Sequence, residues 1–144
     1  MAKKLGNEYR LWIETAVADT FAEIKGQTAT KINRQAGNID TSTKNDFPYG
    51  TALPGRRALS VDFELLPDLP DTAFARLETL SQASPQAPVK FQIRKGGSAG
   101  ATGDVVFAAL MNIGNLDTDF PDNAPVKANG QLTLAAAPTV DTLA

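Results

Sequence analysis

Apolar and polar residues alternate in several short runs of this chain, and this period of two is typical of β-strands with one buried face. Prolines, glycines and small polar residues separate the runs, and such residues commonly end strands. The alternation therefore predicts strands at residues 9–14, 20–24, 59–65, 89–94 and 126–134.

Trp12 is out of step with the apolar residues of the first strand. Leu11 and Ile13 point to one face, so Trp12 falls on the charged face with Arg10 and Glu14. A tryptophan in that position either covers its neighbours at the surface or forms a buried contact with another subunit, where tryptophan is enriched.

The run from Asp104 to Ile113 is apolar on both faces. Val105, Phe107 and Ala109 lie on one face, and Val106 and Leu110 lie on the other. A strand of this kind needs a cover on each side. One cover is the core, and the second is either a helix or a neighbouring subunit.

One segment has the period of a helix. Residues 71–83 follow Pro70 and place Phe74, Leu77 and Leu80 on one apolar stripe. The helix should lie against the sheet. The predicted fold class is mainly β, a β-sandwich or half-barrel with one flanking α-helix, and residues 1–144 should form a single domain.

A hairpin is predicted around Gln35–Asn38, because small turn residues there separate two β-prone runs, Thr28–Arg34 and Ile39–Thr43. Alternation gives this hairpin a packable face and a hydrophilic face. An ordinary half-exposed hairpin has the same pattern. The candidate residues on the hydrophilic face are Lys31, Asn33, Asp40 and Ser42.

A long loop without helix or strand pattern follows at residues 44–55, and such loops are commonly functional. Phe47, Tyr49 and Leu53 place apolar side chains on it with no evident partner in the same chain. We therefore expect the loop to contact another subunit. We expect terminal arms at residues 1–7 and 135–144, and residues 1–7 and 138–144 are secondary candidates for such contacts.

Composition excludes several classes of function. The chain has 144 residues, a net charge of −2, no Cys and no His. Zinc sites, Ser/His triads, thiolate nucleophiles and disulfides are thereby excluded, and no global positive charge attracts nucleic acid. The first residues lack the apolar core of a signal peptide, and no run reaches the ~20 apolar residues of a membrane span. We expect the chain to stay in the cytoplasm unless a larger particle carries it out.

Three motifs could suggest a ligand or catalysis, but each fits a structural role better. The glycine-rich run Gly97–Gly103 precedes a strand, whereas a phosphate loop precedes a helix. Asp117, Asp119 and Asp122 depart from the calcium-loop pattern at Pro121, so a solvated turn is expected. Asp62 and Glu64 lack a neighbouring aromatic sugar platform. We predict no catalytic, cofactor or metal residues, and no enzyme.

The order and spacing of several segments indicate a family. They are Asn7–Glu14, Gly26-Gln27-Thr28, Ile32-Asn33-Arg34, Ile39-Asp40-Thr41-Ser42, Leu53-Pro54-Gly55, Pro88–Arg94 and Asn129–Leu134. In this order they resemble the tail tube (major tail) protein of long-tailed bacteriophages and of the related gene-transfer particles, over nearly the whole chain.

The resemblance implies a structural virion protein that forms hexameric rings, with the sheets of the subunits joined into one β-barrel and the rings stacked into a tube. DNA would be transported cargo that is not specifically bound. Tape measure, tail terminator and tail-tip proteins are the implied partners. The location would be the virion tail, and the host cytoplasm during assembly, without membrane insertion.

The resemblance also assigns roles to residues of this chain. Lys31, Asn33, Asp40 and Ser42 would face the lumen. Contacts between subunits or rings would involve Trp12, Phe47, Tyr49, Leu53, Val106 and Leu110. The alternatives are a related secretion-tube or tail-end ring protein, and a monomeric ligand-binding β-sandwich such as a carbohydrate module.

Overall fold

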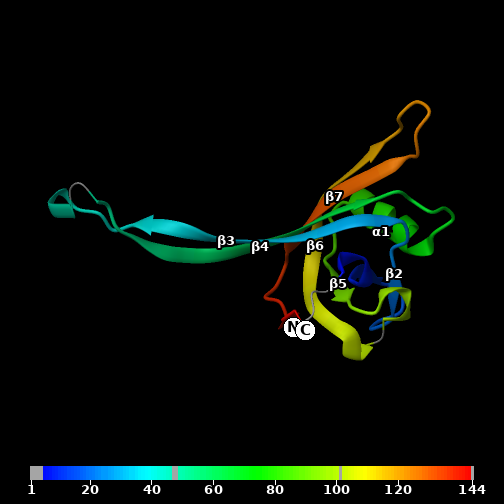
Figure 1. Cartoon of the computed structure of the whole chain (residues 1–144), viewed down its shortest axis with the longest axis horizontal. Helices are drawn as coiled ribbons and strands as arrows, with labels where there is room; N and C mark the ends of the chain where they lie inside the picture. Colours follow the sequence, from blue (N-terminus) through cyan, green and yellow to red (C-terminus); the bar gives the residue numbers. More distant parts are fainter. Residues whose placement is uncertain (1–4, 47–48, 101, 144) are drawn as a thin grey trace.

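The computed structural model describes residues 5–46, 49–100 and 102–143 and is dominated by β-strands (Figure 1). The strands and the α-helix are β1 Arg10–Glu14, β2 Phe21–Glu23, β3 Gln27–Asp40, β4 Ala52–Leu65, α1 Thr72–Gln82, β5 Val89–Arg94, β6 Val105–Asp119, β7 Lys127–Leu134 and β8 Val140–Asp141. Short 3-10 turns occur at Gly6–Glu8, Lys44–Asp46, Gly97–Ala99 and Thr102–Asp104.

The strands form one antiparallel sheet in the order β2-β1-β5-β6-β7-β4-β3, with β8 paired to β6. The sheet bends until its ends approach one another. The side chain of Gln27, at the start of β3, accepts a hydrogen bond from Leu11 N at 2.9 Å and donates one to Leu11 O at 2.8 Å in β1. The fold class is as predicted, with an open half-barrel in the single chain.

The core lies inside this bend. Phe63, Phe91 and Phe107 are at most 1% exposed and come from β4, β5 and β6. The alternating apolar residues of the strands predicted at 9–14, 59–65 and 89–94 pack there with Leu132 of β7. The strand predictions at 20–24, 89–94 and 126–134 are confirmed within one or two residues.

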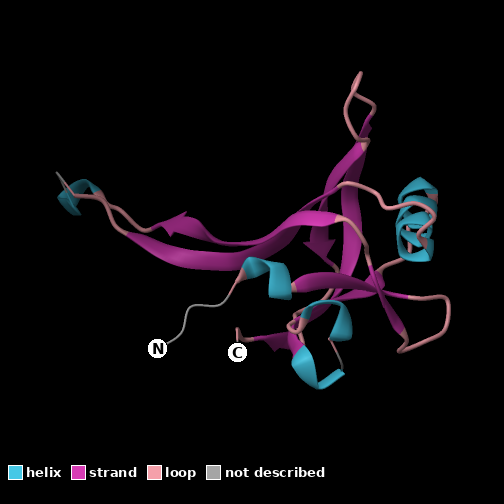
Figure 2. Cartoon of the chain, turned by 45° about the vertical axis from the view of Figure 1, so that its right-hand side comes forward, coloured by secondary structure: helices cyan, strands magenta, loops and turns pink. Residues whose placement is uncertain are grey.

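The helix α1 begins where the sequence predicts. Asp71 caps it, because its Oδ1 accepts a hydrogen bond from Ala73 N at 3.1 Å. Its Oδ2 accepts a second bond from Lys25 N at 3.0 Å and so ties the helix to the turn before β3. Phe74 and Leu77 are buried, Leu80 packs against the core from the edge of the stripe, and α1 lies beside the bend of the sheet (Figure 2).

The predicted turn at Gln35–Asn38 is wrong. β3 runs without a break from Gln27 to Asp40 and pairs with β4, so that Arg34 lies opposite Leu59 and Asp40 opposite Ala52. The strand irregularity between Ala36 and Asn38 is a bulge, at which Gly55 comes close enough to Gly37 that a Cβ would lie 3.0 Å from the Gly37 oxygen. Pairing with a distant strand therefore replaces the local turn.

β6 is also longer than the predicted strand. It continues beyond Ile113 to Asp119, so Asp117 and Asp119 belong to a strand, and of the three predicted turn aspartates Asp122 alone lies outside it. Gly97–Gly103 connects β5 to β6 and precedes a strand, as expected.

The segment after β7 lies along β6. Ala135 N donates to Leu110 O at 2.9 Å, Thr139 N to Ala108 O at 2.8 Å, and Thr142 N to Val106 O at 3.0 Å. This segment therefore lies against the sheet of its own chain, with β8 paired to β6, and a contact between residues 138–143 and another subunit stays a prediction.

Candidate functional site

Four neighbouring strands, β3, β4, β7 and β6, share a surface of polar side chains that we call the polar face. The strand register places its members on one side of the sheet. They are Lys31, Asn33 and Gln35 of β3; Ser60, Asp62 and Glu64 of β4; Lys127, Asn129, Gln131 and Thr133 of β7; and Asn112, Asn115, Asp117 and Asp119 of β6.

Hydrogen bonds connect the polar face across and along strands. Asn33 Nδ2 donates to Asp62 Oδ2 at 2.7 Å, and Asn115 Nδ2 donates to Asp117 Oδ2 at 3.1 Å. Gln131 Nε2 donates to Ser60 Oγ at 3.4 Å. Two lysines and four carboxylates give the polar face a net charge of −2. It is a hydrophilic, mildly acidic surface without large apolar side chains.

The predicted hydrophilic set divides between two places. Lys31 and Asn33 lie on the polar face, whereas Asp40 and Ser42 lie beyond the bulge at the far end of the β3–β4 hairpin. Ser42 N donates to Asp40 Oδ1 at 2.8 Å, and this bond lowers the pKa of Asp40 and begins the loop. The set divides because the predicted turn is a bulge within a continuous strand, so that Asn33 lies opposite Ser60 and Asp40 lies opposite Ala52.

The same four strands end in two edges without a strand partner among the described residues. β3 pairs only with β4, so its outer edge is open. β6 pairs with β5 as far as Met111, and Gln86 Oε1 accepts a hydrogen bond from Ile113 N at 2.8 Å. Beyond Ile113, β6 has β7 on one side and a hollow of about 400 Å³ beside the other, lined in part by Glu78 and Ser81 of α1.

The distal part of the β3–β4 hairpin, residues 36–56, projects far from the body of the molecule, and we call it the arm (Figure 1). Ile39 and Leu53 are paired across the arm and are 55% and 57% exposed, and Tyr49 is 82% exposed. Phe47 lies outside the described residues. Apolar side chains exposed to this extent on a projecting hairpin favour a contact with another protein surface.

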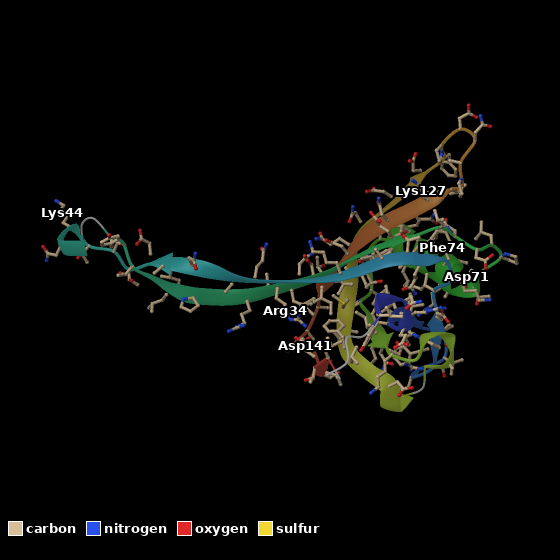
Figure 3. All side chains as sticks on the ribbon, viewed as in Figure 1. Arg34, Lys44, Asp71, Phe74, Lys127 and Asp141 are labelled. Carbon is tan, nitrogen blue, oxygen red and sulfur yellow. The ribbon has the colours of Figure 1, made fainter. Side chains whose placement is uncertain are left out.

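An ion pair stands where the arm leaves the body. The guanidinium of Arg34 contacts the carboxylate of Asp141 in β8 (Figure 3). The hydrogen bond that Arg34 donates to the Asp141 carboxylate raises the pKa of Arg34. β8 thus ties the base of the arm to the body, a contact for which the sequence has no local signal.

Of the other candidate contact residues, Trp12 and Val106 are buried within the chain. Trp12 lies on the charged face, as alternation predicts, but Arg94 lies over its ring and Trp12 is only 9% exposed. Val106 stands at a bulge opposite Ile93 and Arg94, is 6% exposed and packs with the core. The bulge removes Val106 from the face of Leu110, which is half-buried.

Within the described residues, no three His, Cys, Asp or Glu side chains are grouped so that they could hold a metal ion. In the same residues, no helix has the length and apolarity that a membrane span needs.

No protein-family model and no curated protein sequence matches the chain. Several solved structures, however, match the chain over nearly its whole length. A chain from the tail of an empty gene transfer agent (GTA) particle, refined with helical and C6 symmetry, is 15% identical with a TM-score of 0.76, over 97% of this chain and 100% of the other. A chain from the virion of a native gene transfer agent particle is 17% identical with a TM-score of 0.73, over 99% and 100%.

Two further structures have the same fold. The SPP1 tail tube is 11% identical with a TM-score of 0.67, over 96% of this chain and 80% of the other. A chain of the anti-feeding prophage (AFP) baseplate, 6-fold symmetrised, is 8% identical with a TM-score of 0.65, over 99% of each chain. The fold of this chain is thus the fold of tail and baseplate proteins.

Proposed function

We propose that this chain is the structural subunit of a tail tube, in which six copies form a ring and the rings stack around a channel. The observation that carries the proposal is the pair of open edges, on β3 and on β6 beyond Ile113, that bound the four strands of the polar face. Exposed edges invite pairing with another chain, and closure into a barrel removes them.

Strand directions support this closure. β6, β7, β4 and β3 are antiparallel in turn, so β3 runs opposite to β6. The β3 edge of one copy can therefore pair in antiparallel fashion with the β6 edge of the next, and the operation repeats around a ring. C6 symmetry in the GTA tail supports six as the number of repeats.

In such a ring the polar face lines the channel and the apolar faces stay in the subunit cores. Duplex DNA carries one negative charge per about 1.7 Å, so unpaired lysines and arginines on a channel wall would bind it in a salt-dependent way. Asn33, Ser60 and Gln131 offer hydrogen bonds without positive charge, and the carboxylates repel phosphates. DNA is then a cargo that slides through the tube.

The arm is proposed to bind an adjacent subunit or ring. Ile39, Tyr49 and Leu53 would supply its apolar anchors, and Phe47 remains a candidate for the same contact. The arm projects from the body by the length of a two-stranded ribbon, which suits a contact beyond the subunit's own ring (Figure 2). Trp12 and Val106 are buried, so we propose that they support the interface indirectly, by packing inside the subunit. Leu110 remains a candidate for direct contact with another subunit.

This function is non-enzymatic and places the chain in a virion tail, after assembly in the host cytoplasm. Tape measure, tail terminator and tail-tip proteins are the proposed partners at the two ends and within the tube. The likeness to the AFP baseplate favours one second candidate, a ring at the end of a tail or secretion tube, which has the same subunit contacts but does not grow.

Electron microscopy of the purified full chain separates these functions. A tail tube subunit forms rings at low concentration and tubes of increasing length at high concentration. An end ring stops at a single ring. A protein that stays monomeric at every concentration and binds a carbohydrate column would contradict the proposal and favour the ligand-binding β-sandwich.

A further inference from the structure

We propose that Lys31 of one subunit pairs with the carboxylates of Asp117 and Asp119 of the next, and that this charge contact stabilises the seam between β3 and β6. The inference rests on the proposed function, since the seam exists only in a ring. It concerns a contact that the single chain leaves incomplete.

Among the described residues, Lys31, Asp117 and Asp119 have no ion-pair partner. Arg10, Arg34 and Lys90 supply the cations of the ion pairs between described residues, and none of these pairs includes Lys31, Asp117 or Asp119. All three side chains are exposed. Asp62 lies opposite Lys31 in β4, but its carboxylate accepts the hydrogen bond from Asn33.

The two faces of the sheet restrict the seam to registers that differ by two residues. Directly opposite residues of an antiparallel pair point to the same face, and a slip of one residue moves every side chain to the other face. Lys31, Asn33 and Gln35 must therefore lie opposite Asn115, Asp117 and Asp119. A one-residue slip would bring Ile32 and Leu116 to the polar face.

Every register that keeps Lys31 against this edge brings it to a carboxylate. Opposite Asp117 or Asp119, its ammonium meets that carboxylate directly. Opposite Asn115, it lies diagonal to Asp117, and a diagonal pair about 7–8 Å apart is within reach of a long side chain. Pairing of Lys31 with Asp119 uses the whole free edge of β6, with Asn33 against Asp117 and Gln35 against Asn115.

Gln86 marks where the seam begins. Its Oε1 accepts a hydrogen bond from Ile113 N at 2.8 Å, so that this amide is not free to pair with another strand. The β3 strand of the next subunit can therefore pair with β6 only from Gly114 onward. The hollow of about 400 Å³ between α1 and this edge leaves room for the incoming strand. The available edge is thus short, and Lys31 is the one cation that β3 presents on the polar face.

Disulfide cross-linking between engineered cysteines reports which residues lie opposite one another across the seam. The natural chain has no cysteine, so no other disulfide can form. Asn115→Cys of β6 is combined in turn with Asn33→Cys and Gln35→Cys of β3, which leaves Lys31, Asp117 and Asp119 in place. Asn33→Cys with Thr118→Cys is the control, because Thr118 lies on the opposite face of β6. Tubes are assembled under reducing conditions and then oxidised. Disulfides need Cα atoms within about 7 Å, so we expect ladders up to hexamer from a polar-face pair and none from the Thr118 control.

Exchange of the charges tests independently whether the contact between Lys31 and the carboxylates stabilises the assembly. Lys31→Glu should raise the concentration needed for assembly about tenfold or more, since like charges then meet at every seam of the ring. Lys31→Glu with Asp117→Lys should restore assembly, and Lys25→Glu, an equal change away from the seam, should have no effect. Circular dichroism confirms that each variant is folded.

The proposal is overturned if tubes form and no polar-face pair cross-links, if the Thr118 control cross-links equally, or if the exchanged pair assembles no better than Lys31→Glu alone. Absence of tubes from the wild-type chain is a different result, because it contradicts the proposed function itself.

Discussion

The guanidinium of Arg94 lies 4.6 Å from the centre of the Trp12 ring and 5.4 Å from the centre of the Phe21 ring. Arg94 is 5% exposed, and its Nε donates a hydrogen bond to Gln92 Oε1 at 2.9 Å. Burial lowers the pKa of Arg94, while the nearby charge of Asp104 raises it. Aromatic faces and one amide thus hold a buried cation on the outer side of the β1–β5 pair.

Removal of this cation should destabilise the fold. Arg94→Ala loses the contacts with two rings and the bond to Gln92, and we expect the free energy of unfolding to fall by about 1–3 kcal/mol. Denaturant unfolding can be followed by the emission of Trp12, the only tryptophan. Lys90→Ala, on the same strand but exposed, is the control and should leave the unfolding midpoint nearly unchanged. Equal midpoints for wild type and Arg94→Ala would show that the stack contributes nothing.

Two residues of β6 should respond differently to the same substitution. Val106 packs in the core, so Val106→Asp places an unpaired charge there and should unfold the chain. Leu110 is half-buried, so Leu110→Asp should leave a folded protein. Circular dichroism distinguishes the two variants. A folded Val106→Asp variant would mean that the residue does not contribute to the core.

These two residues show where sequence reasoning succeeds and where it stops. The alternating runs and the capped helix are local, and they predict β1, β5, β7 and α1. The bulge at Val106 depends on pairing with Ile93 and Arg94. No pattern within one strand contains that information.

The hairpin shows the same limit. Gly37 and Asn38 have turn propensity, and Pro54 and Gly55 have loop propensity, yet both segments are strands because each supplies the other's hydrogen-bond partners. As a result, only two members of the polar face were identified from the sequence. Lys31 and Asn33 were identified from alternation, whereas Asn129, Gln131 and Thr133 join them only through the register of β4 with β7. The polar alternation of residues 127–133 was the available signal.

Shortening the arm should stop tube growth without unfolding the subunit. Thr41 N donates to Thr51 O at 3.0 Å, so residues 42–50 can be replaced by Asn-Gly, which favours a two-residue hairpin turn. Long loops contribute little closure entropy, so stability should change by less than about 1 kcal/mol. Circular dichroism and electron microscopy measure the two effects. Tubes of normal length from this variant would refute the role of the loop.

The apolar pair of the arm can be tested without any deletion. Leu53→Asp charges a side chain that is 57% exposed, and it should abolish tubes while leaving the unfolding midpoint nearly unchanged. Asp40→Asn, on the same hairpin, is the control and should assemble. Normal assembly of Leu53→Asp would place the contact elsewhere on the arm.

Positive charge on the polar face should make the channel retain DNA. Asn129→Lys with Thr133→Lys adds two charges per subunit at exposed positions of β7, and ring symmetry multiplies them along the tube. Tubes should still form, because exposed polar substitutions typically change stability by about 0.5 kcal/mol. Short duplex DNA should co-sediment with the variant tubes at low salt and be released as salt rises.

The control for this experiment is Thr79→Lys with Gln82→Lys, which adds the same charge on the exposed side of α1. DNA retained equally by both variants would reflect outer-surface binding. DNA retained by neither variant would mean that the polar face does not line the channel.

The most direct test of the central claim is a helical reconstruction of the purified chain by electron cryomicroscopy. We predict stacked rings with C6 symmetry, β3 of each subunit paired with β6 of the next, and the polar face of Asn33, Asp62 and Gln131 turned toward the channel. Tubes with that face turned outward, or a chain that remains monomeric at every concentration, would contradict the account.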